Sequence, residues 1–332
     1  MNIIIEEREA QLGIACGEKG SGKTYYTIKK HILNTLSGKN GQYKPKKVLI
    51  FDINNEYGAV KVDHKNPSFP EIKAIDVDDI DRWIKQPTIE ARRVSCMKPK
   101  KADGTSGGKM KNQELQETLS KILDSYRNGL LIVEDLTNYV SDSLPSDLIG
   151  AIVTQRHVSV DVIIHFQSIS KTAHPQLWAN ANWIRFHCTG DTVKKAAKKL
   201  EGTDLTPLFI AEKMIQAQVK AGNRQNFCVF YHKNTKGKLV GKIQGLFTQQ
   251  MFRKAAEDYL SRNIGIVKEE EAMEDLYTGK KIHANRKATV DFLMEDYFQK
   301  YYGNPDYAKN NPVPTKKISR PDRPTLTRAQ QN

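Results

Sequence analysis

Eight consecutive residues near the start of the chain have types and spacing suited to holding phosphate groups. These residues are Gly17, Glu18, Lys19, Gly20, Ser21, Gly22, Lys23 and Thr24, and they match every fixed position of the pattern GxxxxGK[ST]. Glycines let the backbone curl so that its N–H groups point inward, and a helix that follows adds its positive amino-terminal end. We therefore expect these residues to bind ATP, with Lys23 at the β- and γ-phosphates and the Thr24 hydroxyl on Mg²⁺.

Two adjacent acidic residues, Glu134 and Asp135, directly follow the apolar run 130–133. A strand of this kind presents a carboxylate at its carboxyl end, where one acid can face a metal ion while its neighbour polarises water. By position along the strand we assign Glu134 to Mg²⁺ and Asp135 to the attacking water. The usual order of such a pair is Asp and then Glu, so the exchanged assignment stays open, as does an acidic turn without a catalytic role.

Two polar residues flank the next apolar segment, which is expected to be a strand at residues 160–166. Gln167 ends this strand, where its amide could sense the γ-phosphate or hold the attacking water; a strand-capping glutamine is the alternative. Arg156 precedes the strand and could stabilise phosphate charge from a neighbouring subunit. Its alternative is a surface or ion-paired arginine, and Arg92 and Arg93 are rival candidates for the same task.

The elements that must position these residues follow a simple alternation. Apolar segments typical of buried strands lie at residues 11–16, 47–52, 91–97, 130–134, 160–166, 183–188 and 227–231. Helices are expected at residues 23–34, 114–127, 146–155, 192–199 and 248–262. Strands that alternate with helices predict an α/β fold with a mainly parallel central sheet flanked by helices.

The chain is expected to divide into three parts. Residues 1–245 hold the segments of the predicted ATPase core, and residues 246–302 are expected to form a helical extension. Residues 303–332 contain five of the thirteen prolines and several basic residues without apolar periodicity. We expect this last part to be a disordered tail.

The net charge of +14 on 332 residues is the most informative feature of the composition. A strongly basic protein commonly has a polyanionic partner, and nucleic acid is the commonest one. A membrane surface, or solubility alone, could also explain the charge. Two groups of lysines are candidates for contacts with DNA, although a solvated basic surface is the alternative for each: Lys98, Lys100, Lys101, Lys109 and Lys111 in an expected loop at 98–112, and Lys194, Lys195, Lys198 and Lys199 on one helical face.

Cysteine usage and hydropathy bear on the compartment. The four cysteines lie far apart without a CxxC pair, which argues against a zinc site and a disulfide framework. The apolar runs are too short to span a bilayer, and the first residues lack the pattern of a signal peptide. We expect a cytosolic protein without membrane insertion.

The order of these motifs resembles that of the FtsK–HerA superfamily of ring-forming DNA pumps. The segment FDINNEYG at 51–58 is similar to the D-x-x-x-E-Y of that family, and the apolar strand ending in two acids fits as well. QRH at 155–157, before a strand that ends in FQS, completes the likeness. Residues 156–186 look most like the packaging ATPases of viruses. The resemblance covers about residues 11–235, and the order of Glu134 and Asp135 departs from it.

The resemblance implies a RecA-like (ASCE) core, a homo-oligomeric ring of five or six subunits, and DNA threaded through its centre. It further implies an ATP-driven DNA translocase that pumps a viral genome into a preformed capsid. A capsid or portal-vertex protein would be the partner, and the host cytoplasm or a virion vertex the location. A plasmid-transfer or chromosome-resolution pump of the same superfamily is an alternative, and a nucleotide-gated scaffold without translocation is another.

Overall fold

The computed structural model describes residues 9–41, 43–58, 72–96, 98, 108–136, 146–200, 205–225, 227–231, 244–245, 249–263 and 286–297. The expected tail at 303–332 lies outside these residues, as do Lys100 and Lys101 of the expected basic loop. The division of the chain at residues 245 and 302 stays a prediction.

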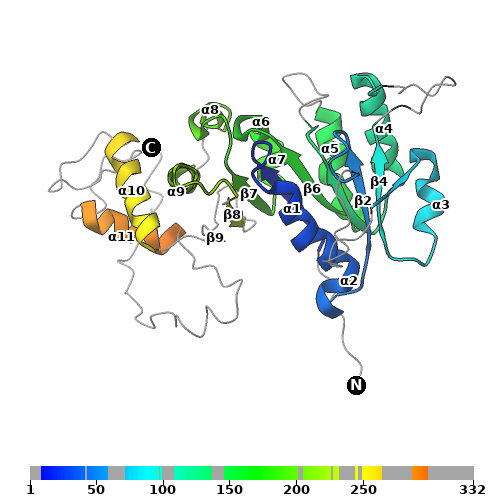
Figure 1. Ribbon diagram of the computed structural model, residues 1–332, viewed down its shortest axis with the longest axis horizontal. Coiled ribbons are helices and arrows are strands. Elements are labelled where there is room, and N and C mark those ends of the chain that lie inside the picture. The colour runs from blue at the N-terminus through cyan, green and yellow to red at the C-terminus, as the bar shows by residue number, and fades with distance from the viewer. Residues whose placement is uncertain are drawn as a thin grey trace, which may run out of the picture. The chain divides into compact units, whose positions relative to one another are not determined.

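One nine-stranded sheet forms the centre of the fold (Figure 1), with the strand order β3-β4-β2-β5-β6-β1-β7-β8-β9. In this order, all neighbouring strands from β3 through β1 to β7 are parallel. β8 is antiparallel to both of its neighbours, β7 and β9. The strands are β1 (Leu12–Cys16), β2 (Lys47–Asp52), β3 (Lys73–Ile75), β4 (Ala91–Ser95), β5 (Gly129–Val133), β6 (Asp161–Phe166), β7 (Trp183–His187), β8 (Phe227–Tyr231) and β9 (Gln244–Gly245).

The strand order identifies the fold class. β6 lies between β1, which leads into the phosphate loop, and β5, which leads into the acidic pair. This additional strand between the two motifs, with β2 beyond β5 and β7 on the far side of β1, is the arrangement of a RecA-like P-loop NTPase. The expected α/β fold with a mainly parallel sheet is confirmed.

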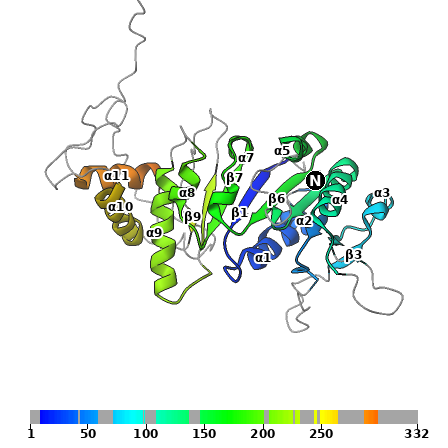
Figure 2. The same cartoon turned by 90° about the horizontal axis from the view of Figure 1, so that it is seen from above.

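Helices cover both faces of the sheet (Figures 1 and 2). Side chains alternate between the faces along each strand. In β2, Ile50 packs in one cluster with Ile28 and Ile32 of the first helix, whereas Phe51 packs in the other cluster with Ile122 of α4. Both faces of the central strands are therefore buried, which explains why these strands are almost continuously apolar in sequence.

The helix after the phosphate loop is longer than expected. It runs through α1 (Lys23–Tyr26), a π-helical stretch (Thr27–Ile32) and α2 (Leu33–Gly41), where Gly38 takes a left-handed φ of 64°, whereas the sequence predicted an end near residue 34. Such π-helical turns inside α-helices are frequently found at functional sites. Here the stretch begins at Thr27, whose side chain enters the polar network described below.

The remaining helices include several that the sequence did not reveal. Those expected are α4 (Asn112–Ser125), α5 (Ser146–Thr154), α8 (Val193–Ala197) and α10 (Gln249–Asn263), and those not expected are α3 (Ile80–Ile84), α6 (Ile169–Thr172), α7 (Pro175–Asn180), α9 (Thr206–Lys220) and α11 (Arg286–Tyr297). Within the described ranges, none of the helices combines the length and apolar character needed to cross a lipid bilayer.

The strand that carries the phosphate loop is fixed by a close approach between Gly13 of β1 and Trp183 of β7. A Cβ atom added at Gly13 would lie 2.0 Å from the Trp183 ring, which in turn stacks on His31 with centroids 4.9 Å apart. A side chain larger than that of glycine at this position would collide with the indole.

Gly13→Ala is therefore expected to lower the free energy of unfolding by about 1–3 kcal/mol, because the Trp183 ring must move. Gly150→Ala is the control for an added methyl group: a Cβ at Gly150 in α5 meets nothing within 4 Å, and helix propensity should raise the stability of this variant by about 0.5–1 kcal/mol. Thermal denaturation of the two variants measures the difference. Equal melting temperatures for both would contradict the close approach.

Candidate nucleotide site

The phosphate loop connects β1 to the first helix through two glycines in the left-handed region. Gly20 and Gly22 have φ angles of 81° and 87°, which side chains other than glycine rarely adopt. Lys23 folds back so that its Nζ donates hydrogen bonds to the carbonyls of Gly17 and, at 3.2 Å, Glu18. The curled backbone and the helix start thus form the cradle that the sequence predicts.

A cleft of about 710 Å³ extends from this loop along the carboxyl edge of the sheet. Its volume is in the range of small-molecule sites. The structure brings together in its lining the predicted Lys23, Thr24, Glu134, Asp135 and Gln167. These residues follow β1, β5 and β6, and the carboxyl ends of parallel strands meet at this edge.

Glu134 lies below the surface of the cleft, against His165 of β6. The register pairs Val133 with Ile164, so that the next residues of the two strands lie at the same level. Glu134 Oε1 is 2.7 Å from His165 Nδ1, and Glu134 is only 2% exposed. Burial alone would raise the pKa of Glu134, but the adjoining His165 ring holds that pKa below its ordinary value. The carboxylate is therefore kept ionised.

Asp135 is held in a different environment. Its φ angle of 49° turns the chain sharply after β5, and its Oδ2 accepts hydrogen bonds from Asn54 Nδ2, at 3.0 Å, and from Gln167 Nε2. Burial raises the pKa of Asp135 above its ordinary value in spite of these two bonds. An acid with a raised pKa beside an amide is well placed to orient and polarise a water molecule.

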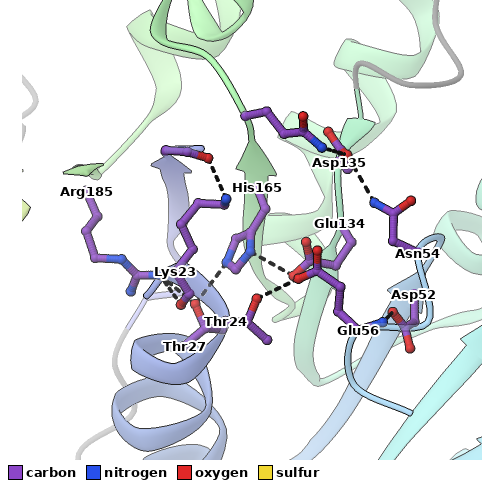
Figure 3. A network of polar contacts seen from close by, with 12 residues as sticks. Lys23, Thr24, Thr27, Asp52, Asn54, Glu56, Glu134, Asp135, His165 and Arg185 are labelled. Carbon is purple, nitrogen blue, oxygen red and sulfur yellow. Dashed lines mark hydrogen bonds and ion pairs between the residues drawn. The ribbon is translucent and has the colours of Figure 1, made fainter. Parts of the chain in front are cut away.

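The sequence interpretation missed a third acid, Glu56. Its Oε2 accepts a hydrogen bond of 2.8 Å from Thr24 Oγ1, so that Glu56, and not Glu134, is the carboxylate in contact with Thr24 (Figure 3). Asp52, which is fully buried, holds the turn that carries Glu56: its carboxylate accepts hydrogen bonds from the backbone N–H groups of Glu56 at 2.8 Å and Gly58 at 3.3 Å. Burial raises the pKa of Asp52 to about 6. The D-x-x-x-E spacing was the available signal.

These residues fit a magnesium ion. Mg²⁺ takes oxygen ligands and is commonly held by one or two carboxylates together with substrate phosphates. Thr24, Glu56 and Glu134 offer such oxygens in one cleft. The loop also fits a phosphate, because Gly20, Gly22 and Lys23 line the same cleft at the start of the first helix.

Behind Glu134 lies a buried polar network that spans three strands (Figure 3). His165 of β6 and Arg185 of β7 both pair in register with Ala15 of β1, so their side chains share one face of the sheet. Thr27 Oγ1 meets both of them: it accepts a hydrogen bond from Arg185 Nη2 and lies 2.9 Å from His165 Nε2. The other ring nitrogen of His165, Nδ1, faces Glu134 Oε1, so the imidazole joins Thr27 to Glu134.

The same arginine also supports the phosphate loop. Arg185 Nε donates to His187 Nε2 at 3.0 Å, so that His187 Nδ1 carries its hydrogen toward the Ser21 carbonyl, 2.9 Å away. Burial, reinforced by the nearby Arg185 charge, holds the pKa of His187 well below its ordinary value and keeps the ring neutral. Polar contacts thus connect the loop backbone to Glu134. The signal in the sequence was a lone polar residue within each apolar strand, IIHF and WIRF.

The candidate arginines lie in different surroundings. Arg156 is exposed and donates a 3.3 Å hydrogen bond to Asn180, away from the residues that line the cleft. Arg92 forms an ion pair with Glu90 at 2.7 Å, and Arg93 lies 3.6 Å from Asp52. Both rivals are thus engaged within their own subunit, whereas the role of Arg156 stays a prediction.

The candidate DNA-binding lysines are also separated. Lys109 lines the nucleotide cleft, Lys98 forms an ion pair of 2.7 Å with Glu114, and Lys111 is exposed at the start of α4. Backbone hydrogen bonds from Lys98 to Gly108 and from Met110 to Cys96 tie the described ends of this loop together. On and after α8 all four candidates are exposed, namely Lys194, Lys195, Lys198 and Lys199.

Comparison with known proteins gives distant structural similarity. The chain matches no family model and no curated protein. Among solved structures it is similar to the genome packaging NTPase B204 from Sulfolobus turreted icosahedral virus 2 in complex with ATP-gammaS. This similarity has a TM-score of 0.42 and 13% sequence identity, and it covers 68% of this chain and 93% of that chain. The AMP complex of B204 gives a TM-score of 0.40, 16% identity, and coverage of 69% and 100%.

A second similar structure is the N-terminal domain of zonular occludens toxin from Neisseria meningitidis, with a TM-score of 0.29, 14% identity, and coverage of 57% of this chain and 91% of that domain. B204 is a protein of the kind that the sequence motifs resemble, a viral packaging NTPase.

The polar network predicts the effect of removing one hydroxyl. Thr27→Val is expected to lower the free energy of unfolding by about 1–3 kcal/mol, because Arg185 and His165 lose a buried partner. Thr27→Ser keeps the hydroxyl and serves as the control. Chemical denaturation of both variants measures the effect, and a Thr27→Val protein as stable as Thr27→Ser would show that the network contributes little.

Proposed function

We propose that this protein is an ATP-driven DNA translocase, and that it packages a viral genome into a preformed capsid. The observation that carries the proposal is the meeting of Lys23, Thr24, three carboxylates and Gln167 in one cleft at the edge of a RecA-like sheet. Phosphoryl transfer needs positioning and charge stabilisation more than covalent chemistry, and this set of groups can supply both.

Each group has a task in hydrolysis. Lys23 and the helix start would bind the β- and γ-phosphates, and Thr24 with Glu56 or Glu134 would hold Mg²⁺, which neutralises phosphate charge when bound. Asp135 would accept a proton from the attacking water that Gln167 orients, because its raised pKa brings it closer to the pH of the cytoplasm. Glu134, whose pKa is lowered, suits the metal better than the proton.

Three observations support DNA as the moved substrate. The chain carries a net charge of +14, the lysines around α8 are exposed, and the motif order resembles that of ring-forming DNA pumps. A ring of five or six subunits would also give Arg156 a site to act on, since it lies apart from the cleft of its own subunit. A capsid or portal-vertex protein would then be the docking partner, in the host cytoplasm or on the virion vertex.

Double-stranded DNA is expected to raise ATP turnover several-fold at low salt, and the stimulation should fall as salt screens phosphate contacts. Lys23→Ala should abolish turnover with and without DNA, because the β- and γ-phosphates lose their cation. Steady-state phosphate release measures both effects. Turnover that DNA leaves unchanged would instead favour a nucleotide-gated scaffold.

Arg156 is expected to act on the site of a neighbouring subunit. Arg156→Ala and Lys23→Ala proteins should each be inactive, but mixed rings should recover part of the turnover, because a Lys23→Ala subunit can offer its intact Arg156 to a neighbour. Mixtures of Arg156→Ala with the double variant are the control and should stay inactive. The assignment is wrong if phosphate release stays at background at every mixing ratio.

A further inference from the structure

A bound nucleotide must extend to one side of the phosphate loop, and the sheet shows which side. β1 lies between β6 and β7, and the acid-bearing β5 lies beyond β6. Glu134, Asp135 and Gln167 follow β5 and β6, so they mark the side of the terminal phosphate. The nucleoside must therefore extend in the opposite direction, toward β7 and β8.

Tyr25 lies in the cleft directly after the phosphate-binding residues. It is 52% exposed, and it is one of two large hydrophobic residues in the described ranges with an exposed side chain. Lys29 Nζ donates a hydrogen bond of 2.9 Å to the Tyr25 hydroxyl and lies 5.3 Å from the ring centroid, so the ring is anchored on the helix. An exposed and anchored aromatic ring is a stacking surface for a nucleobase.

Gln225 lies in the same cleft, in the turn between α9 and β8. A Cβ atom added at Gly22 of the phosphate loop would lie 3.7 Å from Gln225 Cβ, so this side chain passes close to the loop. The neighbouring Arg224 forms an ion pair with Glu18, which ties the turn to the loop. A glutamine amide both donates and accepts, and this matches the amino group and ring nitrogen of adenine.

We propose that Tyr25 and Gln225 form the nucleobase subsite of this cleft. Tyr25 stacks on the base, and Gln225 pairs with its edge and thereby favours adenine over guanine, whose corresponding edge only accepts hydrogen bonds. This subsite presupposes that the cleft binds a nucleotide, as proposed above. It does not require DNA, a ring or translocation.

The test compares ligands with and without a base. Affinities of the full chain for ATP, GTP and inorganic tripolyphosphate are measured by calorimetry in the presence of Mg²⁺. Tyr25→Ala is expected to weaken ATP binding about tenfold or more and to leave tripolyphosphate binding unchanged. Tyr25→Phe, which keeps the ring, should retain most of the ATP affinity. Gln225→Ala should reduce the preference for ATP over GTP about tenfold.

Two exposed residues outside the cleft provide matched controls. Ile89→Ala removes the other exposed large hydrophobic side chain, and Gln216→Ala removes an exposed glutamine of α9; neither should change any of the affinities. The subsite is overturned if Tyr25→Ala weakens tripolyphosphate as much as ATP, or if wild-type protein binds both equally. Unchanged ATPase rates on adding DNA, with ATP binding as expected, would overturn the motor and leave the subsite in place.

Discussion

The contact between Glu134 and His165 is the interaction on which the rest of this site depends. A carboxylate removed from water is costly unless it is paired, and Glu134 is almost completely buried. The pairing requires β5 and β6 to be neighbours in register, which in turn requires β6 to be inserted between β5 and β1. The strand order of the RecA-like sheet is therefore a direct condition for an ionised acid behind the phosphate loop.

Arg185 supports this arrangement, but burying its charge costs desolvation free energy. Its guanidinium is fully buried, and within the described part of the chain its Nη1 has no hydrogen-bond partner. The Tyr26 ring, 4.7 Å from the guanidinium carbon, offsets part of that desolvation by a cation–π contact. In return, the Arg185 guanidinium donates hydrogen bonds that orient both Thr27 and His187. The conformation of the phosphate loop is thus determined from β7 as well as by its glycines.

Site residues that follow a local sequence pattern could be predicted, whereas residues that join the site only through tertiary contacts could not. The phosphate loop, the pair Glu134 and Asp135, and Gln167 were predictable because each follows directly on an apolar strand, and parallel strands bring their ends together. Glu56 was not assigned, because only the fold places it against Thr24, 32 residues earlier. His165 and Arg185 are lone polar residues in apolar strands, and this local signal alone does not show that their side chains meet in one buried network.

The position of Lys109 has a thermodynamic consequence. Its side chain lines the nucleotide cleft, while the backbone of its neighbours is tied to residues 96 and 98 at the end of β4. A ligand whose binding moves Lys109 within the cleft, and so alters the affinity for a nucleotide there, is thermodynamically coupled to that nucleotide. By linkage, the nucleotide then changes the affinity for that ligand by the same factor.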